Sequence, residues 1–368
     1  MDQKIILVND CRELKDFKVN TINNIKNTEI KKELIKCLID NNYDSSLYWT
    51  MEILCSCNFL LLWEIFFYMI TNIINVSNVK LIVYIYNKYE KFKQYINNCN
   101  SENEILDLRN NIEIRNIFCD IVIFICNSQK SFILDYNKLN IKGFTFDNIQ
   151  NFFKAPNVNY VNNYFKDNDP KELYIILNEF LYHLSEKNNI ECFKWIYIYI
   201  NYYNLCKKNK KILLCEHRQN IELSETFNTN LKQHPIWILW SIILEKSNSL
   251  NNKKYINILF IFFKIQLTIG KIKSRIGLLF LSISIFINNN SNEIFDKPIV
   301  KDKKKFLELI DISRKSINNI IKKINSVNKS NNNIPKPKIN NKKDKINKSF
   351  QQLEILDNLM LNKNNNTD

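Results

Sequence analysis

The residues best suited to holding a metal ion are two cysteines and two histidines in the second half of the chain. Cys206, Cys215, His217 and His234 offer thiolate and imidazole ligands, and Cys215 is separated from His217 by one residue. Zinc sites use such ligands at short, regular spacings. The spacings here fit no zinc motif, and no Cys-x-x-Cys pair occurs in the sequence. We therefore predict no metal site and expect buried free thiols in a reducing compartment.

Two glutamates and a histidine in apolar surroundings are the candidates for acid–base chemistry. Glu52 and Glu64 lie in apolar segments close to tryptophans, and His183 lies on the apolar stripe of an expected helix. A buried carboxyl group with a raised pKa can act as a general acid or base. Such side chains more often form hydrogen bonds or ion pairs within a core, and we favour this structural interpretation for all three.

Glycine is too scarce for the common nucleotide-binding loops. The three glycines, Gly143, Gly270 and Gly277, are scattered along the chain. A P-loop needs two of them in a fixed pattern, and a dinucleotide fingerprint needs three close together. The nucleophile-elbow and zinc-protease motifs are absent from the sequence as well. We therefore predict no cofactor and no catalytic residue, and expect the protein not to be an enzyme.

Positive charge is concentrated near the C-terminus. Residues 297–368 hold 17 Lys and Arg against 7 Asp and Glu, a net charge of +10 out of +15 for the chain. A basic run in this segment could neutralise nucleic-acid phosphates and release their counterions. The alternative is a solvated linker that only keeps the chain soluble. The candidate nucleic-acid-binding residues are Lys336, Lys338, Lys342, Lys343 and Lys345.

The elements that carry these residues are predicted to be helices almost throughout. Apolar residues recur at three-to-four spacing, most clearly from Leu173 to Leu184, behind a cap and proline at Asp169-Pro170. The longest apolar stretches are short or interrupted by polar residues, so we expect buried helices and no transmembrane segment.

The two halves of the chain show signs of a repeat. When Glu33 is aligned with Glu179 without a gap, apolar positions coincide and one tryptophan meets another. A second tryptophan pair follows in each half, with a polar insertion at 207–233 in the second half. Two related helical hairpins would explain this pattern, and coincidence in a compositionally biased chain is the alternative. The expected structural anchors are Trp49, Trp63, Trp195 and Trp240.

We predict an all-α helical array with a basic, partly disordered tail. Phe306, Ile310, Ser313, Ile317, Ile320, Ile324 and Val327 form a heptad-like seam that could join two copies of the chain through 306–327. The predicted segments are an N-terminal helical subdomain at 1–126, a connecting segment at 127–168, a second helical subdomain at 169–296, a coiled-coil-like helix at 297–327, and a disordered basic linker with a short terminal helix at 328–368.

Several motifs carry a resemblance to a viral protein family. They are Asn151-Phe-Phe-Lys-Ala-Pro-Asn-Val-Asn-Tyr160, Tyr164-Phe-Lys-Asp-Asn-Asp-Pro-Lys-Glu-Leu173, Leu177-Asn-Glu-Phe-Leu-Tyr-His-Leu184, Ser46-Leu-Tyr-Trp-Thr-Met-Glu52 and Leu62-Trp63-Glu64. Over roughly residues 25–290 the chain resembles an uncharacterised, mimivirus-like protein family of giant nucleocytoplasmic large DNA viruses. The resemblance implies a viral setting and transfers no catalytic residue. At the level of fold alone, the tryptophan-containing hairpin also resembles the helical collar of clamp-loader ATPases.

Two function hypotheses follow. The first is a non-enzymatic structural or scaffold protein of a large DNA virus, not secreted, which acts in the viral factory in the host cytoplasm or is packaged in the virion. Its partners would be other viral proteins. The second is an accessory nucleic-acid-binding protein of viral replication or transcription, which would use the C-terminal tail.

Tyr160, Tyr164 and Phe165 would form a recognition surface or a plug between the two halves.

Overall fold

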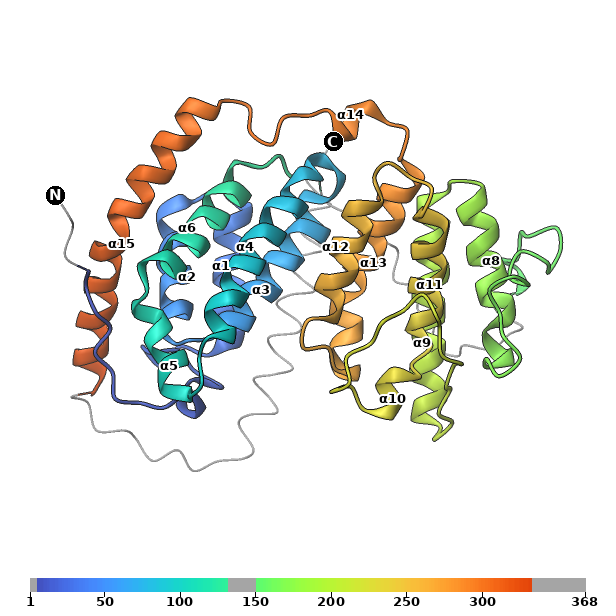
Figure 1. Cartoon of the computed structure of the whole chain (residues 1–368), viewed down its shortest axis with the longest axis horizontal. Helices are drawn as coiled ribbons and strands as arrows, with labels where there is room; N and C mark the ends of the chain where they lie inside the picture. The colour runs from blue at the N-terminus through green and yellow to red at the C-terminus, as the bar shows by residue number, and fades with distance from the viewer. Residues whose placement is uncertain (1–4, 132–149, 333–368) are drawn as a thin grey trace, which may run out of the picture. The chain divides into compact units, whose positions relative to one another are not determined.

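The structure is a computed structural model that describes residues 5–131 and 150–332, and it consists of helices joined by turns and loops (Figure 1). The chain is 67% helical, and the described residues contain no strand. Their one isolated backbone bridge joins Asn20 and Lys26. The predicted all-α fold is confirmed.

Two groups of helices follow each other along the chain. The first group is α1 (Asn27–Ile39), α2 (Tyr43–Cys55), α3 (Phe59–Tyr68), α4 (Lys80–Asn97), α5 (Glu102–Asp107) and α6 (Ile112–Asn127). The second group is α8 (Tyr174–Ser185), α9 (Asn189–Lys208), α10 (Thr229–Lys232), α11 (Ile236–Ser247), α12 (Lys253–Lys264), α13 (Ile272–Ile287), α14 (Asn292–Phe295) and α15 (Lys303–Asn332). Single turns link them at η1 (Leu14–Phe17), η2 (Met69–Ile74), η3 (Asn75–Asn78), η4 (Leu108–Asn110), η5 (Lys171–Leu173) and η6 (Ile269–Lys271).

The hairpins α1–α2 and α8–α9 share the same local geometry at their turns. The side chains of Asn42 and Asn188 cap α2 and α9 by accepting the backbone N–H three residues further on, at 3.1 Å in both cases. The residues just before these caps, Asn41 and Lys187, have φ of 55° and 54°. A left-handed residue ends a helix sharply, so each chain reversal takes only a few residues. These features fall in the register that the sequence alignment predicted.

The tryptophans also occupy matching positions. Trp49 and Trp195 are each the seventh residue of the second helix of their hairpin. Trp63 is the fifth residue of α3, which follows α2, and Trp240 is the fifth residue of α11, which follows α9 after the short helix α10. The order and register of the helices therefore support a repeat, although the two halves differ in their loops.

The four predicted anchors are not buried equally. Trp63, Trp195 and Trp240 are at most 1% exposed, whereas Trp49 is half-buried and contributes less to the core than we expected. Trp237 is an anchor that the sequence did not single out. It is buried, and its indole N–H donates to a backbone carbonyl at 2.6 Å.

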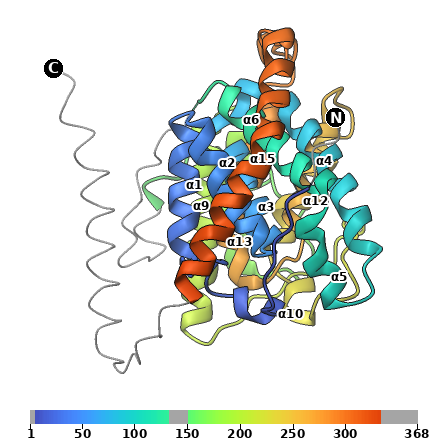
Figure 2. The same cartoon turned by 90° about the vertical axis from the view of Figure 1, so that its left-hand side faces the viewer.

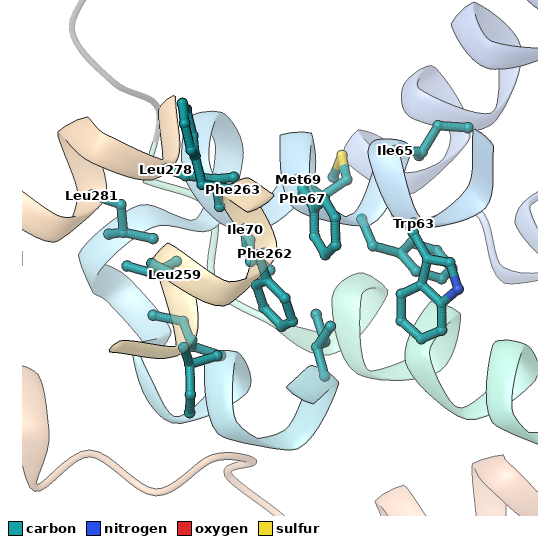
Figure 3. Close-up of a cluster of buried hydrophobic side chains, with 14 of the residues drawn as sticks. Trp63, Ile65, Phe67, Met69, Ile70, Leu259, Phe262, Phe263, Leu278 and Leu281 are labelled. Carbon is teal, nitrogen blue, oxygen red and sulfur yellow. The ribbon is translucent and has the colours of Figure 1, made fainter. Parts of the chain in front are cut away.

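Helices of both halves share one hydrophobic core (Figure 3). Phe67 of α3 stacks on Phe262 of α12 with ring centroids 4.6 Å apart. Gly277 of α13 lies so close to η2 that a Cβ atom there would meet the Thr71 hydroxyl oxygen at 2.9 Å. Residues 1–325 accordingly form one compact unit, with the two predicted helical subdomains inside it. Of the second unit, residues 326–368, only the end of α15 is described.

The most apolar helical stretch is Phe59–Asn78, which comprises α3, η2 and η3. It is long and apolar enough to cross a membrane by length and composition alone, but 67% of its most apolar window is buried inside the structure. Such burial is what a core helix would show. Within it, η2 is a π-helix, a geometry that is frequent at functional sites.

Helix α15 lies along α6 of the first half (Figure 2). Phe306 packs on Phe124 with ring centroids 4.2 Å apart. The predicted heptad seam requires correction, because Ile321 is fully buried while Ile320 is half-buried. A straight helix of 3.6 residues per turn drifts from a strict heptad, and α15 packs along the body of its own chain rather than in a supercoil. Pairing of two copies through 306–327 would therefore require α15 to leave this position.

Candidate functional site

The predicted nucleic-acid-binding run at 336–345 lies outside the described residues. The helix that precedes it, α15, does present lysines to solvent. Two acidic residues, Glu308 and Asp311, are also exposed on this helix. The exposed lysines of α15 include Lys303, Lys304, Lys305, Lys315 and Lys322.

A buried carboxylate connects α15 to the first half. Asp120 of α6 is 2% exposed and accepts two hydrogen bonds from the Arg314 guanidinium, at 2.9 and 2.7 Å. Lys88 of α4 donates to the same carboxylate at 2.6 Å. The contact with Asp120 raises the pKa of Arg314. Paired, charge-assisted hydrogen bonds of this kind fix both the position and the rotation of a helix.

The carboxylate of Glu52, one of the acid–base candidates, binds the loop before α1 through hydrogen bonds. It accepts hydrogen bonds from the Thr21 hydroxyl at 2.7 Å, from the Asn23 backbone N–H at 3.0 Å and from the Asn23 amide at 2.8 Å. Burial raises the pKa of Glu52, and these hydrogen bonds act in the opposite direction. The structural interpretation agrees with this geometry, because three donors from one loop surround the carboxylate.

Glu179, which was not predicted from the sequence, binds a loop of the second half in a similar way. Its carboxylate is buried and accepts the backbone N–H groups of Lys154 and Ala155, at 2.9 and 3.1 Å. The loop before α8 is thereby fixed to the middle of that helix. A glutamate among the buried residues of an amphipathic helix was the sequence feature that could have indicated this role.

The two buried histidines have different partners. His183 lies 3.8 Å from Glu179 and 4.0 Å from Glu191, and its Nε2 has no hydrogen bond. Burial lowers the pKa of His183 despite these carboxylates. His234 accepts the Ile236 N–H through Nδ1 at 3.0 Å, and burial lowers its pKa to about 3. Both imidazoles are held in the core, as the structural interpretation of His183 predicted.

The four metal-ligand candidates are not arranged around a common point. Cys215 donates its thiol to the His234 carbonyl at 3.3 Å, while His217 is exposed. The described part of the chain contains no group of three or more His, Cys, Asp or Glu residues that could hold a metal ion. Burial raises the pKa of four thiols to about 12, and these belong to Cys55, Cys57, Cys119 and Cys215.

The aromatic residues between the halves cover the outside of α8. Tyr160 packs edge-on against Tyr182 at 5.4 Å, and Phe165 packs against Tyr174 at 5.0 Å. The Lys246 ammonium lies 5.3 Å from the centre of the Tyr164 ring. All three contacts are made with residues of the second half.

The remaining acid–base candidate, Glu64, lines a pocket of about 450 Å³ between α1, η2 and α13. Its carboxylate lies 3.0 Å from the Lys271 ammonium and 3.6 Å from the Arg275 guanidinium. Arg275 is 4% exposed, and burial lowers its pKa. Arg275 was not among the residues predicted from the sequence, although an arginine in the first turns of a mostly apolar helix was a visible signal. This is the candidate functional site, because it combines a cavity, a buried cation and a π-helix.

Comparison of the chain with protein-family models, with curated proteins and with solved structures finds no match.

Proposed function

We propose that the chain is a non-enzymatic structural or scaffold protein of a large DNA virus, acting in the viral factory of the host cytoplasm or packaged in the virion. The observation that supports the scaffold role is that buried carboxylates hold separate segments of the chain together through hydrogen bonds. The viral setting is supported by the motifs between Ser46 and Leu184 that resemble a giant-virus family.

The buried charges act at three separate places. Glu52 fixes the loop before α1, and Glu179 fixes the loop before α8. Asp120 fixes α15 to α6 and α4. A buried charge without a partner costs several kcal/mol. The hydrogen bonds of each of these three carboxylates therefore oppose local unfolding of the segment that they hold. A helical array stabilised in this way has surfaces of fixed shape, and a scaffold protein needs such surfaces to bind its partners.

The experiment is purification of the full tagged chain from infected cells and from virions, with nuclease treatment and gradient sedimentation. A scaffold is expected to co-sediment with a constant set of viral proteins before and after nuclease treatment. Cross-linking mass spectrometry would then map the contacts onto the described helices. Sedimentation as a free chain in both preparations would contradict the proposal.

A second candidate function is nucleic-acid binding in viral replication or transcription. The observation that favours it is the row of exposed lysines on α15, which runs towards the lysine-rich sequence after residue 332. Lysines that neutralise phosphates give an affinity that falls steeply with salt concentration and shows no sequence preference.

Charge variants in the full chain test this candidate without removing α15 from the core. One variant changes five lysines in the basic run to Gln, namely Lys336, Lys338, Lys342, Lys343 and Lys345. A second changes five on α15, namely Lys303, Lys304, Lys305, Lys315 and Lys322. A matched control changes five exposed lysines elsewhere, namely Lys32, Lys36, Lys93, Lys208 and Lys253.

The readout is affinity for random duplex DNA at several salt concentrations. Each lost phosphate contact should reduce the slope of log K against log salt by about 0.9. We expect the first two variants to flatten this slope and the control to leave it unchanged. An equal effect of the control would show that net charge alone attracts DNA, and the candidate function would fail.

A further inference from the structure

The pocket beside Glu64 is formed by four elements from the two halves of the chain. Helix α1 contributes one wall, α3 and the π-helix η2 a second, and the first turns of α13 a third. Gly277 allows α13 to approach η2 closely, since any side chain there would meet Thr71. The lining residues that carry the argument are Lys31, Glu64, Phe67, Tyr68, Lys273 and Arg275.

Arg275 in this pocket can be compared with a buried arginine of the first half. Arg115 and Arg275 are each the fourth residue of a 16-residue helix, α6 and α13 respectively. All three guanidinium nitrogens of Arg115 donate hydrogen bonds, at 2.8 Å to the Arg109 carbonyl, 2.9 Å to the Ile6 carbonyl and 3.1 Å to the Asn110 amide oxygen. The first half therefore supplies an acceptor for each of the three guanidinium nitrogens of this buried arginine.

The same position in the second half lacks these acceptors. Arg275 Nη1 donates to the carbonyls of Phe263 and Ile265. Its Nε and Nη2 are buried and have no hydrogen bond, although Nη2 lies 3.6 Å from the Glu64 carboxylate. Leaving buried donors unpaired is costly, and more so when the group is charged. Two neighbouring donors of one guanidinium suit a bidentate anion.

Two lysines add to the positive charge of this pocket. Lys31 is half-buried on α1 and Lys273 is exposed on α13, and neither has an ion-pair partner among the described residues. Lys271, which is not a lining residue, pairs with Glu64, the one acidic lining residue. With Glu64 neutralised by Lys271, the three remaining cations match a ligand that carries two negative charges.

The rest of the wall is apolar and aromatic. Phe67 is buried, while Tyr68 is 39% exposed and Ile35 is half-buried. A cavity of about 450 Å³ is large enough for a small organic molecule as well as its anionic group. Inorganic phosphate alone would leave this wall uncovered.

We propose that this pocket binds a small organic phosphate monoester. The phosphoryl oxygens accept hydrogen bonds from Arg275, Lys273 and Lys31, and the organic group lies against Phe67 and Tyr68. The proposal stands independently of the scaffold function. In this proposal, the ligand provides hydrogen-bond acceptors for Arg275, as the Arg109 and Ile6 carbonyls and the Asn110 amide oxygen do for Arg115.

The experiment is isothermal titration calorimetry of the full chain at pH 7.5 and low salt, with three probes. Phenyl phosphate carries both recognised parts, inorganic phosphate carries the anion alone, and phenol carries the ring alone. We expect one saturable site for phenyl phosphate, weaker binding of inorganic phosphate and none of phenol. Affinity for phenyl phosphate should also fall as the pH drops below the second phosphate pKa of about 6, because the ligand loses a charge.

Surface variants locate the site. The double variant Lys31→Glu with Lys273→Glu places two negative charges at the pocket, and it should weaken phenyl phosphate binding by about tenfold or more. The control is Lys32→Glu with Lys93→Glu, which makes the same charge change at two exposed lysines outside the pocket. It should leave the affinity within about twofold of the wild type, a difference well below 1 kcal/mol.

Several results would overturn the proposal. They are no saturable binding of phenyl phosphate, equal affinity for phenyl phosphate and inorganic phosphate, binding of phenol as tight as that of phenyl phosphate, and equal loss of affinity in the two double variants. Circular dichroism of each variant establishes that it is folded before titration. All four substituted lysines are exposed or half-buried, so folding is expected to survive the changes.

Discussion

Protonation of His234 should destabilise the protein at mildly acidic pH, and the substitution His234→Asn should remove this effect. The imidazole is 2% exposed, and its Nδ1 accepts the Ile236 N–H at the start of α11. Because Nδ1 is the acceptor, the neutral ring carries its proton on Nε2. A proton added to Nδ1 would face the N–H donor, so the charged form loses this hydrogen bond as well as its hydration.

The sign and size of the effect follow from the pKa difference. Burial lowers the pKa of His234 from its usual 6.5 to about 3. Between these values the unfolded chain binds a proton that the folded chain does not, so stability is lost as the pH falls from 6.5 towards 3. Each pH unit in this window corresponds to about 1.4 kcal/mol, and a fall from pH 6.5 to pH 5.0 should therefore cost about 2 kcal/mol.

The assay is urea unfolding followed by tryptophan fluorescence at pH 7.5, 6.5 and 5.0. Asparagine can present its side-chain oxygen to Ile236 but does not titrate. The wild type should lose about 2 kcal/mol more than His234→Asn between pH 7.5 and 5.0, while groups common to both proteins cancel. His217→Asn, a change at an exposed histidine of the same segment, should retain the wild-type pH dependence. If the two substituted proteins respond alike, the reasoning from His234 is refuted.

Three other predictions concern packing, the position of α15 and thiol reactivity. Gly277→Val should destabilise the protein by about 1–3 kcal/mol in chemical unfolding because its Cβ meets Thr71, and Thr71→Ala should recover part of the loss. Arg314→Met should leave the body folded and raise hydrogen exchange in α15, since it removes two hydrogen bonds to buried Asp120, whereas the same change at the next residue, an exposed lysine, should not. In the folded protein, a thiol reagent should modify exposed Cys11 first and react with the buried cysteines only on unfolding.

Local signals in the sequence were sufficient for the helices but not for all of their caps. The cap predicted at Asp169-Pro170 is wrong, because η5 separates this pair from α8 and Asp169 instead accepts the backbone N–H groups of Lys166 and Glu216, at 2.9 and 3.0 Å. The asparagines before α2 and α9 occupy positions where a short polar side chain is favoured, and the structure uses both as caps. The amphipathic stripe of α8 was visible because its apolar residues face one side. The π-helix η2 was not visible, since the residues from Met69 to Ile74 are mostly apolar and fit an ordinary helix equally well.

The difference at α15 has a tertiary cause. A seven-residue repeat and a 3.6-residue stripe coincide over two turns and separate over five, so a sequence of this length fits both. The structure favours the straight stripe because Phe306 finds an aromatic partner on α6 and Arg314 finds Asp120 there. Those partners lie almost 200 residues earlier in the sequence, and no local pattern identifies them.

The candidate pocket could not be found from sequence because it depends on a contrast between the two halves. Around Arg115, the N-terminal segment folds back and supplies the Ile6 carbonyl, and its neighbour Val8 donates to Asn110 at 2.8 Å. In the second half, the loop at 150–170 packs on α8 and is held there by Glu179. The guanidinium nitrogens of Arg115 are therefore hydrogen-bonded within the chain, while Arg275 keeps two buried nitrogens without a hydrogen bond and lines a cavity. A repeated arrangement in which only one copy receives the covering segment leaves a binding site at the other copy, and the exposed lysines near Arg275 give that site its preference for anions.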